Sequence, residues 1–517
     1  MKMLIRRFGL SYYDAMNRLG DGSNLQNIGL SFVIRIRSNY YLLSLMLLVA
    51  STIIIAPVIT AQPSFAQPVP QKEKVVLTVI IVQLHSNRDI GKTLLDRALT
   101  NLKMIYPNLD IQLKYLEYPY NQLQSQLLKM LNGTKASGSI DLISLDQIWL
   151  GEFAQKGFLT DLTNYTKNWG RQNDWYPENW DGGIYGGKMY GIWTWTDIRG
   201  IWYWKDLLGK AGVNPDSLKT WDGYIAAAKK LNTVLRPQGI EGVHLTGASH
   251  SPDLWYPYLW MLGGEILKMK SGHPTKGTYW FPAFNSTEGV KAMNFIKQQI
   301  DAGIKPQKNH FFGSEFLDRK FAVMIEGSWL PVPFLQSQPQ KNFEDRIGFI
   351  PTLPVPYKNN QTSTLMGGWA LSIPKASIHK YLAWKLMELM LTPKILNPFL
   401  LQGGYLPTQI SMGTSDLLYS TASSYPYYRQ LVSMIPSAGT RPSIPEYPQI
   451  ADNIRQAIYE VQFENKEPKQ ALQEAAWSSP TDDFYCHSIP ISRIHQIAII
   501  FSIWGKQNMQ IPIAIPM

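Results

Sequence analysis

Four tryptophans and one aspartate lie in one glycine-rich stretch, GKMYGIWTWTDIRGIWYW, which starts at Gly187. A saccharide presents hydroxyl groups, which carboxylates and backbone groups bind, and apolar C–H faces, which Trp and Tyr rings cover. Segments that leave a tight turn often carry binding residues, so three residues of this stretch are the better candidates for function: Trp193, Trp195 and Asp197. The later tryptophans, Trp202 and Trp204, are expected to pack in the core.

Isolated carboxylates raise the alternative of glycoside hydrolysis, which needs two of them at a fixed separation. The candidates are Asp146, Asp181, Asp197 and Glu326. The spacing of these residues along the chain does not define such a pair, and acids near aromatic side chains more often accept hydrogen bonds from a bound ligand. A surface glycosidase therefore stays open only as an alternative.

The remaining catalytic and metal-binding patterns are missing from the sequence. It contains neither a His-Glu-x-x-His motif nor a Gly-x-Ser-x-Gly motif, and its one cysteine, Cys486, excludes both an intramolecular disulfide and a cysteine-based zinc site. Two Gly-Lys segments lack the residues that a phosphate-binding loop requires: Ser86 replaces the first glycine of one, and Met189 replaces the hydroxyl residue of the other. We therefore predict a protein that is not an enzyme, with no catalytic residue, metal site or cofactor.

The net charge of +11 is concentrated at the two ends of the chain. Residues 1–40 contribute +4 and residues 484–517 contribute +2, which leaves +5 for residues 41–483. That central part has no run of Lys or Arg, so nucleic acid is not an expected partner.

An apolar run from Tyr40 to Ala61 follows Arg35 and Arg37 and precedes a Pro/Gln-rich linker. A basic flank, an apolar core and small residues up to Ala66 predict a secretory signal peptide, but the run is also nearly long enough to remain as a membrane anchor. Residues 1–66 are thus a signal or an anchor with a long N-terminal extension, and residues 67–74 are a linker. Either alternative places the body outside the cytoplasm, as a secreted, periplasmic or cell-surface protein.

Alternating strand and helix patterns predict an α/β fold. Apolar runs at 75–82, 109–117 and 139–146 predict strands, and helical periodicity separates them at about 89–106 and at 120–131. This order favours a parallel sheet with helical crossovers. Further helices are expected at 220–231, 285–303, 380–391 and 451–463, and further strands at 320–328 and 367–373.

Seven segments, in this order, carry a resemblance to a known family: IDLISLDQIWLGEFAQKGFLTDLT, YGGKMYGIWTWTDIRGIWYWKDLLGKAGVNPDSLKTWDGY, KFAVMIEGSWL, IGFIPTLPVP, TLMGGWALSIPK, GGYLPT and RPSIPEY. Over residues 75–483 the chain resembles an extracellular solute-binding protein of family 1, the maltose/trehalose-type sugar-binding component of ABC importers. The family's C-terminal helix has no clear match before the tail at 484–517, to which we assign no role.

The resemblance implies a two-lobed periplasmic-binding-protein fold with the ligand in a cleft between the lobes. The first lobe would comprise residues 75–195 and 357–403, and the second 196–350 and 408–483. Crossing segments are expected near 192–198, 349–357 and 403–408.

The resemblance also implies the roles of individual residues. Asp146 and Asp197 would accept hydrogen bonds from hydroxyl groups, and Arg441 would donate them. Three tryptophans would stack on the ligand: Trp260, Trp329 and Trp369. Five further residues would complete the site: His85, Ser86, Trp195, Glu326 and Gly368.

We therefore predict a monomeric receptor that captures a disaccharide or oligosaccharide and delivers it to an ABC transporter permease in the membrane. A related receptor for glycerol phosphate, another polyol or a peptide is the alternative within the same class. A phosphate ligand would require several cationic groups, and only Arg441 stands out.

Overall fold

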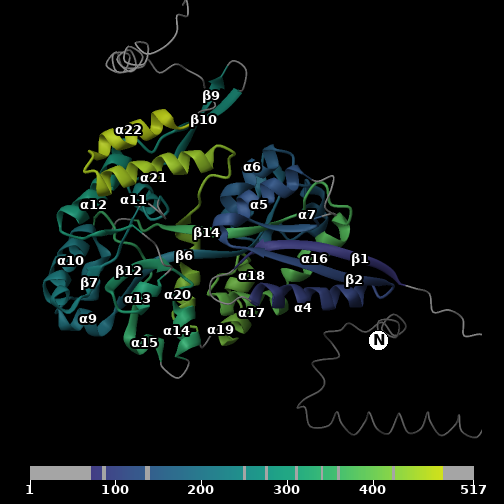
Figure 1. Ribbon diagram of the computed structural model, residues 1–517, viewed down its shortest axis with the longest axis horizontal. Coiled ribbons are helices and arrows are strands. Elements are labelled where there is room, and N and C mark those ends of the chain that lie inside the picture. Colours follow the sequence, from purple (N-terminus) through teal and green to yellow (C-terminus); the bar gives the residue numbers. More distant parts are fainter. Residues whose placement is uncertain are drawn as a thin grey trace, which may run out of the picture. The chain divides into compact units, whose positions relative to one another are not determined.

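The computed structural model describes residues 72–83, 89–133, 140–247, 252–273, 277–308, 313–338, 342–357, 361–421 and 425–480 (Figure 1). The predicted signal or anchor, residues 67–71 of the predicted linker, and the tail at 484–517 lie outside these residues. Within them, no helix combines the length and the apolar character that crossing a bilayer requires.

The predicted parallel sheet is confirmed at its N-terminal part. Strand β1 (Glu73–Val82) pairs in parallel with β2 (Leu109–Tyr118) and with β3 (Leu142–Asp146). Helices α4 (Ile90–Ile105) and α5 (Tyr120–Asn132) connect these strands. The side chains of Leu77, Val79 and Ile80 are fully buried, so neighbouring side chains on both faces of β1 are covered, as its continuous apolar run indicates.

One long strand, β6 (Ile192–Trp204), continues the sheet. Its first half pairs with β14 (Thr364–Ser372), which lies antiparallel between β3 and β6. Its second half pairs with β12 (Phe321–Gly327) and β13 (Ile347–Ile350), and β12 pairs with β7 (Glu241–Val243). The main strand order is β2-β1-β3-β14-β6-β12-β7.

The three predicted crossing segments contact one another through β6. Residues 192–198 are its first half, and Phe349 and Ile350 pair with its second half. Leu406 forms a bridge with Thr196 through two backbone hydrogen bonds. These contacts bring segments separated by more than two hundred residues to the same part of the sheet.

The four later helices form where predicted, with small differences at their ends. Helix α10 (Trp221–Leu235) is capped by the Thr220 hydroxyl, and α12 (Thr287–Asp301) by that of Ser286. Helix α16 (Lys380–Met390) begins at the predicted residue and ends one residue earlier than predicted, and α21 (Tyr447–Phe463) begins one turn earlier than predicted. Helix α22 (Pro468–Ser478) packs against α21 and α12, so a further helix that the sequence analysis did not predict forms between α21 and the tail.

The remaining elements are short. The helices are α6 (Leu150–Gln155), α7 (Thr163–Trp169), α8 (Pro177–Asp181), α9 (Lys205–Lys210), α11 (Tyr256–Met261), α13 (Ser314–Leu317), α14 (Pro331–Ser337), α15 (Phe343–Arg346), α17 (Pro393–Gly403), α18 (Ile410–Gly413), α19 (Asp416–Thr421) and α20 (Tyr428–Ser433). The strands are β4 (Ile184–Tyr185), β5 (Lys188–Met189), β8 (Leu245–Thr246), β9 (Leu267–His273), β10 (Gly277–Pro282), β11 (Pro306–Gln307) and β15 (Ala438–Gly439).

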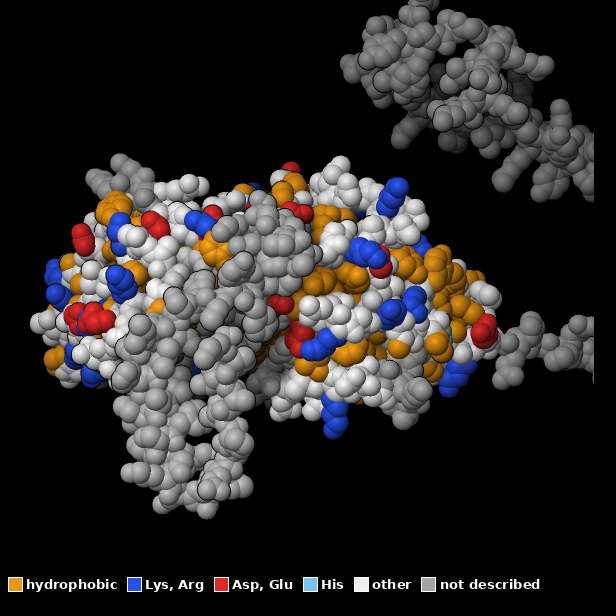
Figure 2. Space-filling view, turned by 90° about the horizontal axis from the view of Figure 1, so that it is seen from above, with side chains coloured by type: hydrophobic (Ala, Val, Ile, Leu, Met, Phe, Trp, Pro, Cys, Tyr) orange, Lys and Arg blue, Asp and Glu red, His pale blue; other side chains and the backbone are white. Residues whose placement is uncertain are grey.

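The described surface carries charges of both signs. On the face in Figure 2, the Lys and Arg side chains of described residues lie scattered among Asp and Glu rather than in one basic patch. This distribution agrees with the small net charge of the central part of the chain.

Candidate ligand-binding site

Three predicted site residues lie side by side on adjacent strands. Trp369 of β14 pairs with Asp146 at the end of β3 on one side and with Trp195 of β6 on the other. Residues directly opposite each other on antiparallel strands project to the same face of the sheet. The sheet register therefore brings one carboxylate and two indole rings to a common face.

A bulge in β6 decides which tryptophans reach that face. The register shifts so that Ala370 pairs with Trp193 while Trp369 pairs with Trp195, which leaves Thr194 as the extra residue. Trp193 is fully buried, and a Cβ atom added at Gly368 would lie within 3.0 Å of its ring. The grouping of Trp193 with Trp195 and Asp197 was therefore wrong: Trp193 packs on the other face, and Gly368 makes room for it.

The common face carries a row of aromatic rings. Trp369 and Trp195 stack with ring centroids 5.9 Å apart, and Trp195 stacks on Tyr405 at 4.0 Å. On its other side, Trp369 makes edge contacts with Trp149 at 5.7 Å and with Tyr120 at 6.0 Å. The rings of Trp195 and Trp369 are only 6% and 7% exposed, so they are buried rather than open to solvent in this structure.

Arg441 pairs with two carboxylates beside this row. Its Nη2 atom lies 3.2 Å from Asp146 Oδ1, and its Nη1 atom lies 3.3 Å from Asp253 Oδ2. Asp146 also accepts hydrogen bonds from the Tyr120 hydroxyl at 3.1 Å and from the backbone N–H of Ile148 at 3.4 Å. We call Asp146, Asp253 and Arg441 the charged triad.

Burial and the attraction between opposite charges have opposing effects on the pKa values of Asp146 and Arg441 in the charged triad. Burial raises the pKa of Asp146 above its ordinary value, although the charge of Arg441 acts in the opposite direction. Burial alone would lower the pKa of Arg441, but attraction to Asp253 and Asp146 outweighs it and holds that pKa well above its usual value. The Nε atom of Arg441 is buried and has no hydrogen-bond partner among the described residues.

A second polar group follows Trp195 along the same face of β6. Asp197 forms an ion pair with Arg199, and the Arg199 guanidinium lies 5.0 Å from the centroid of the Trp329 ring. Gly367 leaves room for Asp197, because a Cβ atom at that position would lie 2.7 Å from its carboxylate. The Trp329 Nε1 atom is also buried without a hydrogen-bond partner among the described residues.

Trp260 lies near the segment that carries Arg441. Its ring stacks on Tyr256 at 5.7 Å, and a Cβ atom at Gly439 would lie 2.6 Å from it. Gly439 belongs to β15, which pairs with the first residues of β14. Trp260 is partly exposed, so its ring offers a free surface that the buried rings do not.

One predicted residue, Glu326, does not join this cluster. Glu326 pairs with Gly200, and the alternation along β12 directs its side chain to the face opposite Gly327 and Arg199. It is 3% exposed and accepts a hydrogen bond from the backbone N–H of Gly327. His85 and Ser86 lie outside the described residues.

Several residues at the site escaped the sequence analysis: Tyr120, Trp149, Arg199, Asp253 and Tyr405. Arg199 could have been found, because residues two apart on a strand share a face and Arg199 follows Asp197 at that interval. Asp253 had no comparable signal, because its partner Arg441 is 188 residues away.

The chain matches a known protein family and is similar to known proteins. A family model described as bacterial extracellular solute-binding protein matches residues 97–395, more than half of the chain. The chain belongs to this family. A binding protein of Brucella abortus is 26% identical over 382 residues, which cover 71% of this chain and 85% of that protein.

Two solved structures share the fold. An ABC transporter solute-binding protein from Thermotoga lettingae, bound with α-D-tagatose, is 25% identical, with a TM-score of 0.62 over 78% of this chain and 98% of that one. A Mycobacterium tuberculosis protein in complex with glycerophosphocholine has a TM-score of 0.63 at 16% identity, over 84% of this chain and all of that one.

These findings define the class of protein. The chain has the periplasmic-binding-protein fold and is a solute-binding component of an ABC transporter, which implies partnership with a permease. The family is non-enzymatic and acts outside the cytoplasm. Among the described residues, no group of three or more His, Cys, Asp or Glu side chains is arranged to hold a metal ion.

Proposed function

We propose that this protein captures a neutral saccharide, a disaccharide or oligosaccharide, at the cluster built around the charged triad and delivers it to its permease. The observation that carries the proposal is the pair of buried donors, Arg441 Nε and Trp329 Nε1, which lack partners among the described residues. Buried polar groups are nearly always satisfied, and sugar hydroxyl oxygens are suitable acceptors. Carboxylates and aromatic rings nearby suit the remaining faces of a sugar.

The charges of the cluster disfavour an anionic ligand. Three carboxylates, those of Asp146, Asp197 and Asp253, face two guanidinium groups, and each guanidinium is already paired with a carboxylate. A glycerol phosphate ligand would have to displace these pairs. A linear polyol lacks the ring face that tryptophan covers, so the aromatic rings favour a cyclic sugar over it.

We also propose a division into two lobes, residues 75–195 with 357–403 and residues 196–350 with 408–483. Under this division Asp146 belongs to the first lobe, Asp253 to the second, and Arg441 to the segment that returns to the second. A ligand that binds both lobes would favour the closed arrangement by a shift of population rather than by chemistry.

Within this site, we assign hydrogen-bond acceptance to Asp146 and Asp197, donation to Arg441, and stacking to Trp260 and Trp329. The buried rings of Trp195 and Trp369 hold the neighbouring site residues in place, while the backbone of Gly368 and the side chains of His85 and Ser86 are secondary candidates for ligand contact. The body acts as a monomer outside the cytoplasm, either released after cleavage near Ala66 or tethered through residues 40–61. N-terminal sequencing of the mature protein distinguishes these two forms.

The test is a thermal-shift screen of the purified protein against neutral saccharides, polyols, glycerol phosphate and peptides. A ligand present at a hundred times its Kd stabilises the folded state by about 2.7 kcal/mol, so a binding saccharide raises the Tm measurably. The saccharide is then recovered and must be chemically unchanged. Stabilisation by glycerol phosphate alone, or cleavage of the saccharide, contradicts the proposal.

A further inference from the structure

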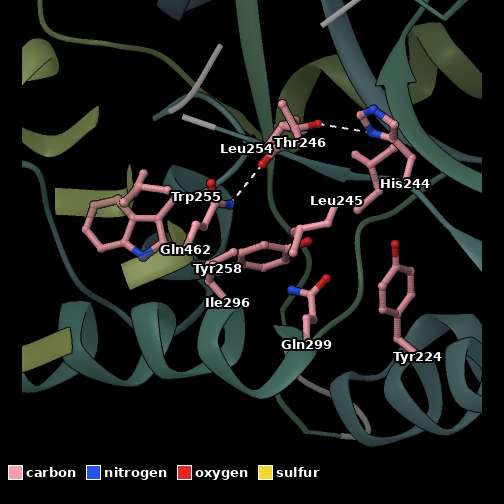
Figure 3. Close-up of a pocket in the computed structure, with 12 residues that line it drawn as sticks. Tyr224, His244, Leu245, Thr246, Leu254, Trp255, Tyr258, Ile296, Gln299 and Gln462 are labelled. Carbon is pink, nitrogen blue, oxygen red and sulfur yellow. Dashed lines mark hydrogen bonds between the residues drawn. The ribbon is translucent and has the colours of Figure 1, made fainter. Parts of the chain in front are cut away.

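A small cavity lies between β12, α10, α11, α12 and α21 (Figure 3). Its volume is about 30 Å³, and nearly all of the residues that line it are buried. None of them belongs to the charged triad or to the row of aromatic rings. The residues of the cavity wall therefore determine what occupies it.

Two buried polar atoms of the cavity wall lack hydrogen-bond partners among the described residues: Trp255 Nε1 and Gln462 Oε1. Trp255 is 1% exposed and Gln462 is 6% exposed. The orientation of the Gln462 amide is fixed, because its Nε2 atom donates to the backbone oxygen of Thr246 at 3.0 Å. The wall thus presents one donor that needs an acceptor and one acceptor that needs a donor.

The size of the cavity determines the class of ligand. A water molecule requires about 10–15 Å³ of space for its centre and two to four polar partners. A volume of about 30 Å³ excludes a sugar or a cofactor and accommodates one or two waters.

We propose that this cavity is a structural water site, in which ordered water accepts a hydrogen bond from Trp255 Nε1 and donates one to Gln462 Oε1. The Thr246 and Tyr258 hydroxyls and the Gln299 amide also line the cavity and provide further partners (Figure 3). The water connects α21 to the residue that immediately precedes α11. This inference does not depend on the identity of the transported solute.

Protein labelled with ¹⁵N-tryptophan provides the test. The full chain is prepared, the indole N–H signal of Trp255 is assigned through a Trp255→Phe variant, and its cross-relaxation with water is measured. Trp202 and Trp204 are matched controls, because they are equally buried but donate to the backbone oxygens of Glu326 and Phe316 at 3.1 and 2.9 Å. We expect a water cross-peak at Trp255 and none at the two controls.

A crystal structure that resolves ordered water provides the second readout, because exchangeable hydroxyl protons near an indole N–H can also give rise to a water cross-peak. Electron density within hydrogen-bonding distance of both Trp255 Nε1 and Gln462 Oε1 supports the proposal. A Gln462→Leu variant should lose the Trp255 cross-peak, while Gln456→Leu, an exposed position on the same helix, should retain it. Absence of the cross-peak in the unmodified protein, or a dry or otherwise occupied cavity, overturns the proposal.

Discussion

Replacing Arg441 by methionine tests the charged triad most sharply. The Arg441 side chain is 7% exposed and pairs with Asp146, also 7% exposed, and with Asp253, 19% exposed. Methionine retains much of the aliphatic volume but removes the charge, so Asp146 keeps only the Tyr120 hydroxyl and the Ile148 N–H as partners. Removing one partner of a buried ion pair costs about 3–5 kcal/mol, a large fraction of the roughly 5–15 kcal/mol of a typical domain.

The pH dependence of this loss follows from the pKa of Asp146. Burial already raises that pKa, and removing Arg441 raises it further because the opposing attraction disappears. An acid with a raised pKa in the folded state binds more protons there than in the unfolded state, so stability increases as the pH falls through that pKa. We therefore expect Arg441→Met to be most destabilising at pH 7 and progressively less so as the pH falls toward the ordinary pKa of an aspartate, about 4.

The measurement is urea denaturation of the ligand-free variants at pH 7 and at about pH 4. Arg455→Met is the control, because Arg455 is 37% exposed and pairs with Asp452 on the surface of α21; its loss should be within about 1 kcal/mol. The double variant Arg441→Met, Asp146→Asn should lose less than the sum of the single variants, by about 0.5–3 kcal/mol. A cost below about 1 kcal/mol for Arg441→Met at pH 7 refutes the reasoning.

Three further substitutions test the surrounding residues. Trp369→Ala should lower the free energy of unfolding by about 3–5 kcal/mol, because its ring is buried among aromatic neighbours; thermal melting measures this, and a loss below about 1 kcal/mol would contradict the observed burial. Trp260→Ala should weaken saccharide binding by about 1–3 kcal/mol in calorimetry, whereas Trp477→Ala, at an exposed position on α22, should leave affinity unchanged. Gly368→Ala should cost about 1–3 kcal/mol or more in chemical denaturation, because its Cβ meets the Trp193 ring, while Gly209→Ala, with open space in helix α9, should be neutral or stabilising; equal effects of the two glycine substitutions would contradict this packing.

Much of the fold could be predicted from local patterns. The run at 75–82 predicts a strand covered on both faces, and the Ser286 cap and Gly303 closely bracket helix α12. These features depend on residues that are neighbours in the sequence. The later start predicted for α21 reflects the difficulty of locating helix ends without their caps.

The candidate site was harder to predict, because it depends on pairing between distant segments. Asp146 and Arg441 were identified separately as ligand residues, but their contact joins positions 295 residues apart. The direction of Trp193 depends on the bulge at Thr194, which a strictly alternating strand pattern does not reveal. The polar residues that lie beside the tryptophans could therefore be identified only from the way the strands pair in three dimensions.

Titration calorimetry of the purified full chain tests the central claim most directly. Neutral monosaccharides, disaccharides and oligosaccharides are titrated alongside ribitol and glycerol phosphate, and each saccharide is recovered afterwards. We predict saturable one-to-one binding of a disaccharide or oligosaccharide, which is recovered unchanged, and weakened binding in the Trp260→Ala variant. Binding of glycerol phosphate in preference to every saccharide, or turnover of the bound sugar, would contradict the account.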